Sequence, residues 1–331
     1  MQVAEGIAVE RIGDEPIVLF GAVPGYGPIF NAGAVFHDGR FHLFARGVRD
    51  EYRRNGGSGA RFLDYVSDIL VFTSPDGRRY EFQQVLAEGA ANGIYSWEDP
   101  RVQRVRSDGE GHFVVSNANL PPPEANEFWR IGVHRLAYSD GRFRLEDGSG
   151  AVVGPPGEPD KDGIVFNLRD GRVALVHRIY PNMQLAVFDS LEQLWDPPPG
   201  FWDGYMADLE RHTILRPAET SLGVGAGAPP VVTEDGLLLL FHERDGRERY
   251  STKAALLDPD TGEVLSALPE PVMSPELDWE RRGDVNEVVF VQGAIPRPDG
   301  SIYMTYGAAD RNVGAASVST DELLRALRAA A

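Results

Sequence analysis

One short phrase recurs five times along this chain of 331 residues, and its spacing constrains the fold more than any other feature. Each copy has a polar residue and a glycine, followed by a run of apolar and aromatic residues that ends on polar ones. Successive glycines stand 62 to 70 residues apart, at Gly39, Gly109, Gly171, Gly236 and Gly300. Internal repetition of this kind is typical of propellers and other repeat architectures.

The repeated phrase predicts a β-hairpin, because Asp-Gly between two apolar runs suits a tight turn in which glycine takes a positive φ. A third strand-like segment follows each hairpin, and weaker fourth segments include residues 80–87. Three or four antiparallel strands, repeated five times, predict an all-β fold, namely a five-bladed β-propeller. We expect a single domain over residues 1–331, with blades at about 31–90, 97–155, 160–215, 225–275 and 284–318.

The last blade lacks an outer strand, so we expect the N-terminal segment near residues 8–12 to supply it and close the ring. A short C-terminal helix is predicted, with Thr320 as its N-cap, because acidic residues follow and Leu323, Leu324 and Leu327 share one face. Short helices are also expected near residues 190–195 and 202–212.

The composition excludes several classes of protein. The chain has no cysteine, which excludes disulfides, thiol catalysis and cysteine metal sites. A net charge of −18 argues against nucleic acid as a partner. No apolar run approaches the ~20 residues of a membrane span, and the N-terminus lacks a signal-peptide pattern. We therefore expect a soluble cytoplasmic protein with no membrane partner. The terminal helix and residues 195–202 are candidate contact surfaces for a homo-oligomer.

Inner strands of a propeller line a central channel, so polar residues at equivalent strand ends should meet in one pocket. Carboxylates, amides and arginines match sugar hydroxyls, and an aromatic ring covers the apolar face of a sugar. The residues with this placement are Asn31, Arg46, Glu98, Asp99, Arg101, Asn117, Asn119, Lys161, Asp162, His177, Arg178, His242, Glu243, Arg244, Asp284, Asn286, Glu287, Tyr306 and Asp310.

Simpler interpretations exist for several of these residues. Asp99-Pro100-Arg101 also suits a turn with a surface ion pair, and His177 also suits a core histidine beside an exposed arginine. The glycine-rich residues 223–230 lack the Lys-Ser/Thr of a phosphate-binding loop, so we expect a structural turn there.

Taken together, several segments resemble glycoside hydrolase family 130, the β-mannoside phosphorylases and related mannosidases. They are NAGAVFHDGRFHLFAR, SWEDPRV, KDGIVFNLRDGRVALVHR, GAGAPPVVTEDGLLLLFH and IYMTYGAADRNVGAASV, and they lie between residues 31 and 318. The resemblance implies a five-bladed propeller and cleavage of a β-mannosidic linkage with inversion, by phosphate or water. It also implies that Asp99 is the general acid, whose proton in the phosphorylases passes through a sugar hydroxyl.

The resemblance assigns two groups of binding residues and no metal or organic cofactor, with inorganic phosphate as co-substrate and a small oligosaccharide as substrate. Sugar contacts from Arg46, Arg101 and Asp310 are implied by the resemblance. Further sugar contacts are expected from Asn31, Glu98, Asn119, Asp162 and Tyr306 because of their place in the predicted pocket. Phosphate contacts are expected from Arg130, Lys161, His177, Arg178 and His242.

Two glutamates, Glu243 and Glu287, depart from the family pattern, in which neutral residues are expected. An inverting hydrolase needs a second carboxylate to activate water, whereas phosphate arrives already ionised. These glutamates favour hydrolysis, whereas the group of cations favours phosphorolysis. We expect phosphorolysis to mannose 1-phosphate, and a hydrolase with Glu243 or Glu287 as base stays open. A non-catalytic sugar-binding propeller is the third alternative.

Overall fold

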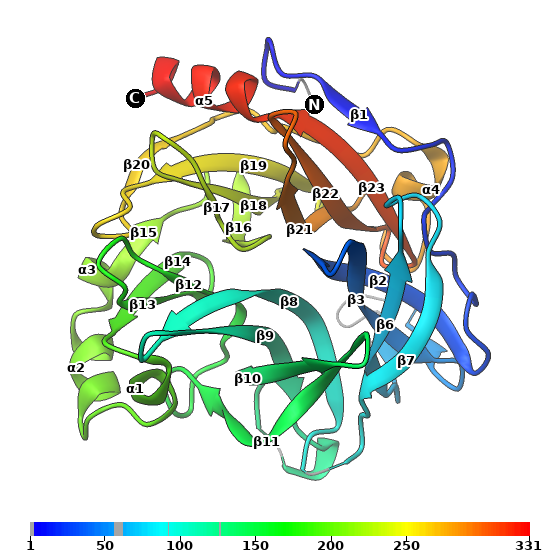
Figure 1. The fold of residues 1–331 in the computed structure, drawn as a ribbon, viewed down its shortest axis with the longest axis horizontal. Helices are drawn as coiled ribbons and strands as arrows, with labels where there is room; N and C mark the ends of the chain where they lie inside the picture. Colours follow the sequence, from blue (N-terminus) through cyan, green and yellow to red (C-terminus); the bar gives the residue numbers. More distant parts are fainter. Residues whose placement is uncertain (1–2, 56–61, 92, 126) are drawn as a thin grey trace.

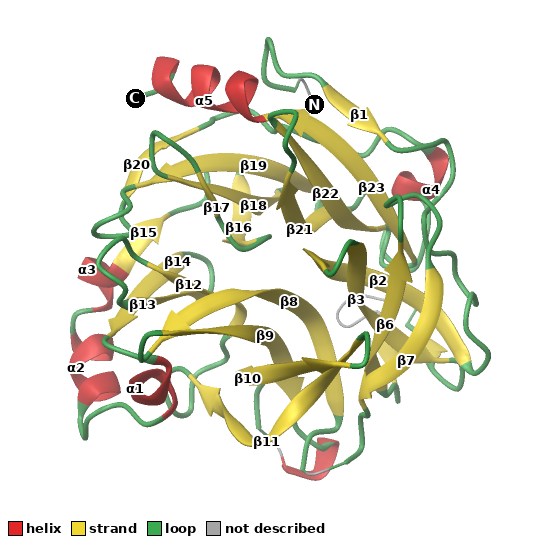
Figure 2. Ribbon diagram, viewed as in Figure 1, coloured by secondary structure: helices red, strands yellow, loops and turns green. Residues whose placement is uncertain are grey.

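The computed structural model describes residues 3–55, 62–91, 93–125 and 127–331. Five antiparallel sheets stand around a common axis and form a five-bladed β-propeller, which confirms the predicted fold class (Figures 1 and 2). The inner strands of neighbouring blades contact one another around this axis. The Asp-Gly turns lie at one end of the inner strands, and the polar residues of the predicted pocket lie toward the other end.

The first three blades each have four strands, in order from the axis outwards. The first contains β2 (Tyr26–His37), β3 (Arg40–Arg49), β6 (Ser67–Ser74) and β7 (Glu81–Ala87). The second contains β8 (Ser96–Ser107), β9 (Glu110–Leu120), β10 (Arg130–Ser139) and β11 (Arg142–Val153). The third contains β12 (Lys161–Asn167), β13 (Val173–Arg178), β14 (Met183–Phe188) and β15 (Thr213–Leu215).

The last two blades differ in how they are completed. The fourth contains β16 (Ser221–Ala226), β18 (Leu237–Asp245), β19 (Tyr250–Leu257) and β20 (Val264–Ala267), and β17 (Val231–Val232) pairs with β18. The fifth contains β21 (Val289–Pro296), β22 (Ser301–Ala308), β23 (Asn312–Ser319) and β1 (Val9–Arg11). β1 lies antiparallel to β23, with Val9 opposite Val318, so the N-terminal segment provides the outer strand of the last blade. A separate two-stranded sheet pairs β4 (Arg53–Arg54) with β5 (Phe62–Leu63).

Helices lie outside the sheets. They are α1 (Leu191–Trp195), α2 (Phe201–Ala207), α3 (Leu209–His212), α4 (Asp278–Arg281), α5 (Thr320–Ala329) and a 3₁₀ turn at Pro123–Ala125. The N-cap of α5 is Ser319 and not Thr320, since Ser319 Oγ accepts a hydrogen bond from Glu322 N at 3.3 Å. No helix in the described ranges is long and apolar enough to cross a membrane.

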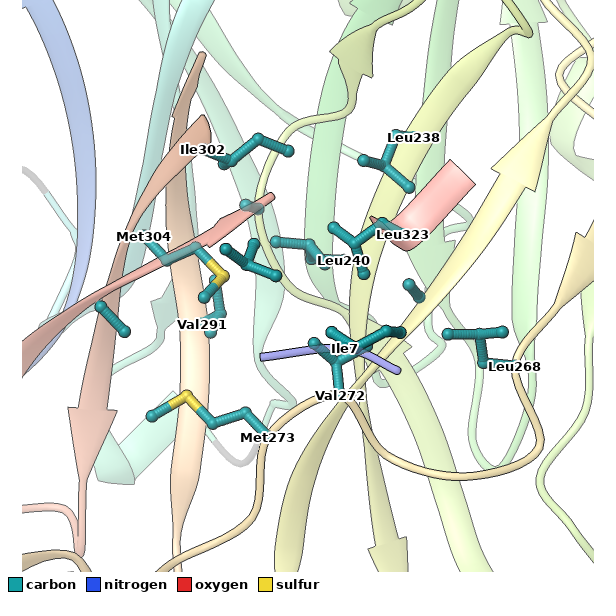
Figure 3. Close-up of a cluster of buried hydrophobic side chains, with 14 of the residues drawn as sticks. Ile7, Leu238, Leu240, Leu268, Val272, Met273, Val291, Ile302, Met304 and Leu323 are labelled. Atoms are coloured by element: carbon teal, nitrogen blue, oxygen red, sulfur yellow. The ribbon is translucent and has the colours of Figure 1, made fainter. Parts of the chain in front are cut away.

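The hydrophobic core is divided among the interfaces between blades. Five clusters of buried side chains each fill the space between two neighbouring blades. The cluster between the fourth and fifth blades also takes Ile7 from the N-terminal segment and Leu323 from α5 (Figure 3). Each blade therefore buries both faces only because a neighbour covers it, as expected for radially packed repeats.

A buried ion pair joins the N-terminal strand to the fifth blade. Arg11 Nε and Nη2 donate to Glu280 Oε1 and Oε2 at 2.7 and 2.9 Å, and the Glu280 side chain is fully buried. Arg11 also donates to the Ser274 carbonyl oxygen at 2.8 Å. This network fixes the strand that completes the ring.

Candidate active site

The inner strands of the first three blades each contain a β-bulge toward the same end of the propeller. The bulges hold Asn31, Asp99 and Asp162, whose φ angles are 48°, 50° and 57°. Asn and Asp enter this left-handed region more readily than most residues, and a bulge redirects a side chain. As a result Asn31 Nδ2, from the first blade, donates to Asp99 Oδ1, from the second, at 2.8 Å.

Asp99 lies in a buried group of polar side chains from two blades. Its side chain is 7% exposed, and Asp99 Oδ1 lies 3.6 Å from Nη1 of Arg46. Arg46 Nη2 donates to Glu98 Oε1 at 2.8 Å, and its guanidinium lies over the rings of Phe30 and Tyr65. The Asp99 carboxylate is therefore held by one amide and one arginine.

Asp310 of the fifth blade belongs to the same group. It follows β22 with a φ of 50° and is half-buried. Burial raises the pKa of Asp310 to about 7; Asp99 also raises it, while Arg46 and Lys161 lower it. At neutral pH the protonated form of this carboxyl group is therefore populated beside the ionised form.

Asp162 connects the third blade to the second and fourth. Asp162 Oδ1 accepts a hydrogen bond from Arg101 Nη2 at 3.2 Å; Asp162 Oδ2 lies 3.1 Å from Arg178 Nη1 and 3.6 Å from His242 Nε2. Burial alone would raise the pKa of Asp162, yet Arg178, His242 and Arg101 hold it well below its usual range. Burial lowers the pKa of His242 to about 3, so this imidazole is neutral at pH 7.

Arg101, expected from the sequence to contact a sugar, connects the second blade to the third and fourth. Its side chain is fully buried. Besides Asp162, its guanidinium donates to the backbone oxygens of Asp99, Ala226 and Gly227 at 2.8, 3.0 and 3.1 Å. With its donors engaged in this way, Arg101 has little capacity left for a ligand.

A cavity of about 250 Å³ opens beside Asp162. Three cationic side chains line it, namely Lys161, Arg178 and Arg244, together with the carboxylate of Asp160. Each cation lies over one aromatic ring that also lines the cavity: Trp129, Tyr180 and Tyr250, at 5.4, 5.9 and 5.7 Å from the ring centroid. These three rings were not predicted from the sequence, although Tyr250 stands directly opposite Arg244 in a hairpin.

The glycine-rich residues 223–230 contain the inner strand β16 and are not only the turn expected from sequence. Gly225 faces the site, because a Cβ atom there would lie 2.4 Å from Asp162 Oδ2 and 2.5 Å from His242 Cε1. Only a residue without a side chain permits this approach. β16 therefore contributes space, and not a phosphate-binding loop.

A larger cavity of about 1060 Å³ lies toward the Asp-Gly turns, at the opposite end of the inner strands. Apolar residues from all five blades dominate its wall, and the described residues that line it include no carboxylate. The larger cavity thus has no side chain among these residues that can act as a general acid. The group around Asp99, Asp162 and Asp310 is the candidate active site.

Two predicted ligands lie in the core instead. His177 is fully buried between Asp160 Oδ2 and the Tyr205 hydroxyl, each 2.8 Å from a ring nitrogen. Tyr306 is also buried, and its hydroxyl donates to Glu280 Oε1 at 2.7 Å. Successive residues of a strand point to opposite faces, so Arg178 and not His177 reaches Asp162.

The two glutamates proposed as hydrolytic bases have their described contacts elsewhere. Glu243 follows His242 and points to the other face of β18, where it forms an ion pair with Lys253 and accepts from Ala218 N at 2.8 Å. Glu287 contacts Tyr250 through its backbone oxygen, at 3.0 Å. Within the described ranges, neither carboxylate forms a hydrogen bond or ion pair with the three acids of the site.

The remaining two predicted ligands, Arg130 and Asn119, have their described side-chain contacts within the second blade. Arg130 Nη2 donates to the Gly154 carbonyl oxygen at 2.9 Å, so the backbone of the second blade engages a guanidinium expected to bind phosphate. Asn119 accepts from Asn117 and packs over Gly132. The contacts of the described residues connect neither side chain to Asp99.

Comparison with known proteins gives a family for this arrangement. The family model described as beta-1,4-mannooligosaccharide phosphorylase matches residues 162–329, just over half of the chain. A curated relative, beta-1,2-mannobiose phosphorylase of Listeria innocua, is 38% identical over 280 residues, which cover 81% of this chain and 71% of that protein. The chain belongs to glycoside hydrolase family 130.

Two further comparisons extend the family 130 match over nearly the whole chain. The 1,2-beta-oligomannan phosphorylase of Thermoanaerobacter sp. is 29% identical over 326 residues, which cover 96% of this chain and 99% of that protein. A solved structure of Listeria innocua beta-1,2-mannobiose phosphorylase with beta-1,2-mannobiose superposes with a TM-score of 0.75 and 20% identity, covering 97% and 99%. At that identity the superposition shows a shared fold.

Proposed function

We propose that this family 130 enzyme cleaves β-mannosides with inversion by phosphorolysis and releases mannose 1-phosphate. The observation that carries the proposal is the cavity lined by Lys161, Arg178 and Arg244. It is connected to Asp99 through Arg178, Asp162 and Arg101, whose guanidinium donates to the Asp99 backbone oxygen. A phosphate dianion needs cations and hydrogen-bond donors to offset the loss of its hydration. On a chain of net charge −18, such a local cluster of cations is needed to attract an anion.

In this proposal Asp99 provides the proton for the leaving sugar, directly or through a hydroxyl of the mannose. Arg46, Glu98, Asn31 and Asp310 then hold the mannose, because they surround Asp99 and offer both donors and acceptors. Binding by several fixed polar groups orients the scissile bond toward the acid, which is a large part of catalysis.

Phosphate in this proposal occupies the cationic cavity, where Lys161 and Arg178 bind it. Arg178 is fixed by Asp162, and the neutral His242 lies behind it, 3.6 Å from the same Asp162 oxygen. The carboxylate of Asp162 orients these groups and is itself neutralised by Arg101. Phosphate enters already ionised, so its attack needs no general base.

Water as nucleophile is the weaker alternative, because an inverting hydrolase needs a second ionised carboxylate at roughly 6.5–9.5 Å from the acid. Glu243 is neutralised by Lys253 on the far face of its strand. Asp310 lies in the site, and with a pKa raised to about 7 it is the carboxyl group that this alternative would use as base.

For the linkage we propose β-1,2 before β-1,4. Curated relatives that span most of this chain are named as phosphorylases of β-1,2-linked mannosides, whereas the description of the family model names β-1,4-mannooligosaccharides.

The test is incubation with β-1,2- and β-1,4-mannobiose, each with and without inorganic phosphate, followed by analysis of the sugars released. We expect cleavage of β-1,2-mannobiose only in the presence of phosphate. Free mannose at equal rates with and without phosphate would show a hydrolase, and sugar binding without turnover would show a lectin-like propeller.

A further inference from the structure

Among the described residues that line the cavity, Arg244 is the one cation that approaches from the fourth blade. Lys161 and Arg178 belong to the third blade and form the opposite wall. The Arg244 side chain is 31% exposed, and its buried Nε has no hydrogen-bond partner in the described part of the chain. A donor is thus available at the edge of a cavity with cations on its other side.

Three neighbours set the position of this side chain. In β18, Arg244 stands between Gly223 of β16 and Tyr250 of β19. Gly223 leaves room for the ring of Tyr180, since a Cβ atom at residue 223 would lie 2.8 Å from it. Arg244 also shares the face of His242, two residues earlier, because the side-chain period of a strand is two.

One cation of the third blade is already paired, because Arg178 forms an ion pair with Asp162. The Asp160 carboxylate of the same wall is engaged by His177 and by the backbone nitrogen of Arg178. The described carboxylate partner of Arg244 is Glu248, at 2.9 Å, and Glu248 is 56% exposed. Exposed ion pairs are weak and exchange readily, so an anion in the cavity can replace Glu248.

From this geometry we propose that Arg244 is a phosphate-binding residue that closes the anion site from the fourth blade. Glu248 occupies its guanidinium while the site is empty and competes with phosphate. The inference rests on the proposed function for its role in turnover, but the binding of phosphate itself can be measured without any sugar.

The first measurement is calorimetric titration of inorganic phosphate into the sugar-free protein. Loss of one charge-assisted contact should weaken phosphate binding by Arg244→Gln about ten- to a hundred-fold. Glu248→Gln should strengthen it about two- to three-fold, because a weak competitor is lost. Arg247→Gln, at an exposed arginine three residues away, is the matched control and should bind like the parent.

The second measurement is steady-state phosphorolysis of β-1,2-mannobiose. Arg244→Gln should raise KM for phosphate and leave KM for the disaccharide unchanged. Parent-like phosphate binding by Arg244→Gln, or no phosphate binding by the parent protein, would overturn the role of Arg244. Absence of phosphorolysis by a parent protein that binds phosphate through Arg244 would instead refute the proposed function alone.

Discussion

Polar residues with a positive φ provide much of the chemistry of this site. Asn31, Asp99, Asp162 and Asp310 have φ angles between 48° and 57°. Such a backbone costs of order 1 kcal/mol or more at each residue and persists only where the surrounding structure enforces it. Here the bulges and the hairpin after β22 enforce it, and the result is a set of carboxyl and amide groups that converge between blades.

Asp99→Asn should lower kcat by about a hundred-fold or more, because the amide cannot donate the proton required by general acid catalysis. Asparagine tolerates the same φ and retains an acceptor for Asn31, so the fold should persist. Asp108→Asn is the matched control, since Asp108 also has a positive φ but lies in an Asp-Gly turn at the far end of the blade. Full activity of Asp99→Asn would remove Asp99 as the acid.

Asp310 should make stability depend on pH. A carboxyl group whose pKa rises to about 7 on folding binds more protons in the folded than in the unfolded state between about pH 4 and 7. Its contribution to the free energy of unfolding therefore decreases as the pH rises through that range. Asp310→Asn lacks this fall. Its free energy of unfolding relative to the parent should therefore increase by about 2–3 kcal/mol from about pH 5 to about pH 8.

Urea denaturation at the two pH values measures this difference. The burial of neutral His242 acts in the opposite direction, and comparison with the parent at each pH cancels it. Asp14→Asn, at an exposed carboxylate, is the control and should show no change with pH. If the free energy of unfolding of Asp310→Asn differed from that of the parent by the same amount at both pH values, the raised pKa would be contradicted.

The inner strand β16 approaches Asp162 closely, although its glycine-rich sequence predicted only a turn. Gly225→Ala would place a methyl group 2.4 Å from Asp162 Oδ2 and force the carboxylate away from Arg178. We expect a loss of about 1–3 kcal/mol in stability, as for an overpacked core, and at least a ten-fold higher KM for phosphate. Thermal denaturation and steady-state kinetics measure the two effects.

The control for β16 is Gly204→Ala in α2, where a Cβ atom would have no neighbour within 4 Å. This variant should be as stable as the parent or slightly more so, because alanine favours a helix more than glycine does. Parent-like phosphate kinetics in Gly225→Ala would show that the approach of β16 to Asp162 does not matter for the site.

The strands and their turns were predictable from the sequence. Which of two adjacent polar side chains points toward the site was not. The pairs His177-Arg178 and His242-Glu243 lie in equivalent strands, β13 and β18, and in each pair only one residue reaches Asp162. The register of each strand against its bulged neighbour sets which of the two faces Asp162. Neither feature can be read from the residue types, so His177 was placed at the site and Glu243 was proposed as a base.

At the scale of the whole molecule, five repeats were sufficient to predict the ring. Each blade-to-blade interface encloses its own hydrophobic cluster. It was harder to predict which end of the ring carries the candidate site, because inner-strand residues are exposed at both ends. The larger cavity lies at the end where the described lining has no carboxylate. The carboxyl groups and cations of the lining side chains, and not the volume of the cavity, distinguish the two ends.

Closure of the ring should depend on Arg11. Arg11→Met leaves the buried Glu280 carboxylate without its cation, so we expect a loss of about 3–5 kcal/mol in the free energy of unfolding. Arg328→Met removes a pair at an arginine that is 53% exposed and should change stability by at most about 1 kcal/mol. Chemical denaturation distinguishes the two, and equal losses would argue against a special role for the N-terminal strand.

The central claim is inverting phosphorolysis at the Asp99 site, and ³¹P NMR of the parent protein with β-1,2-mannobiose and inorganic phosphate tests it most directly. We predict that the phosphate signal declines while the signal of α-mannose 1-phosphate grows, because inversion converts a β-mannoside into the α-phosphate. A constant phosphate signal while free mannose accumulates, or a β-phosphate as the first product, would contradict it.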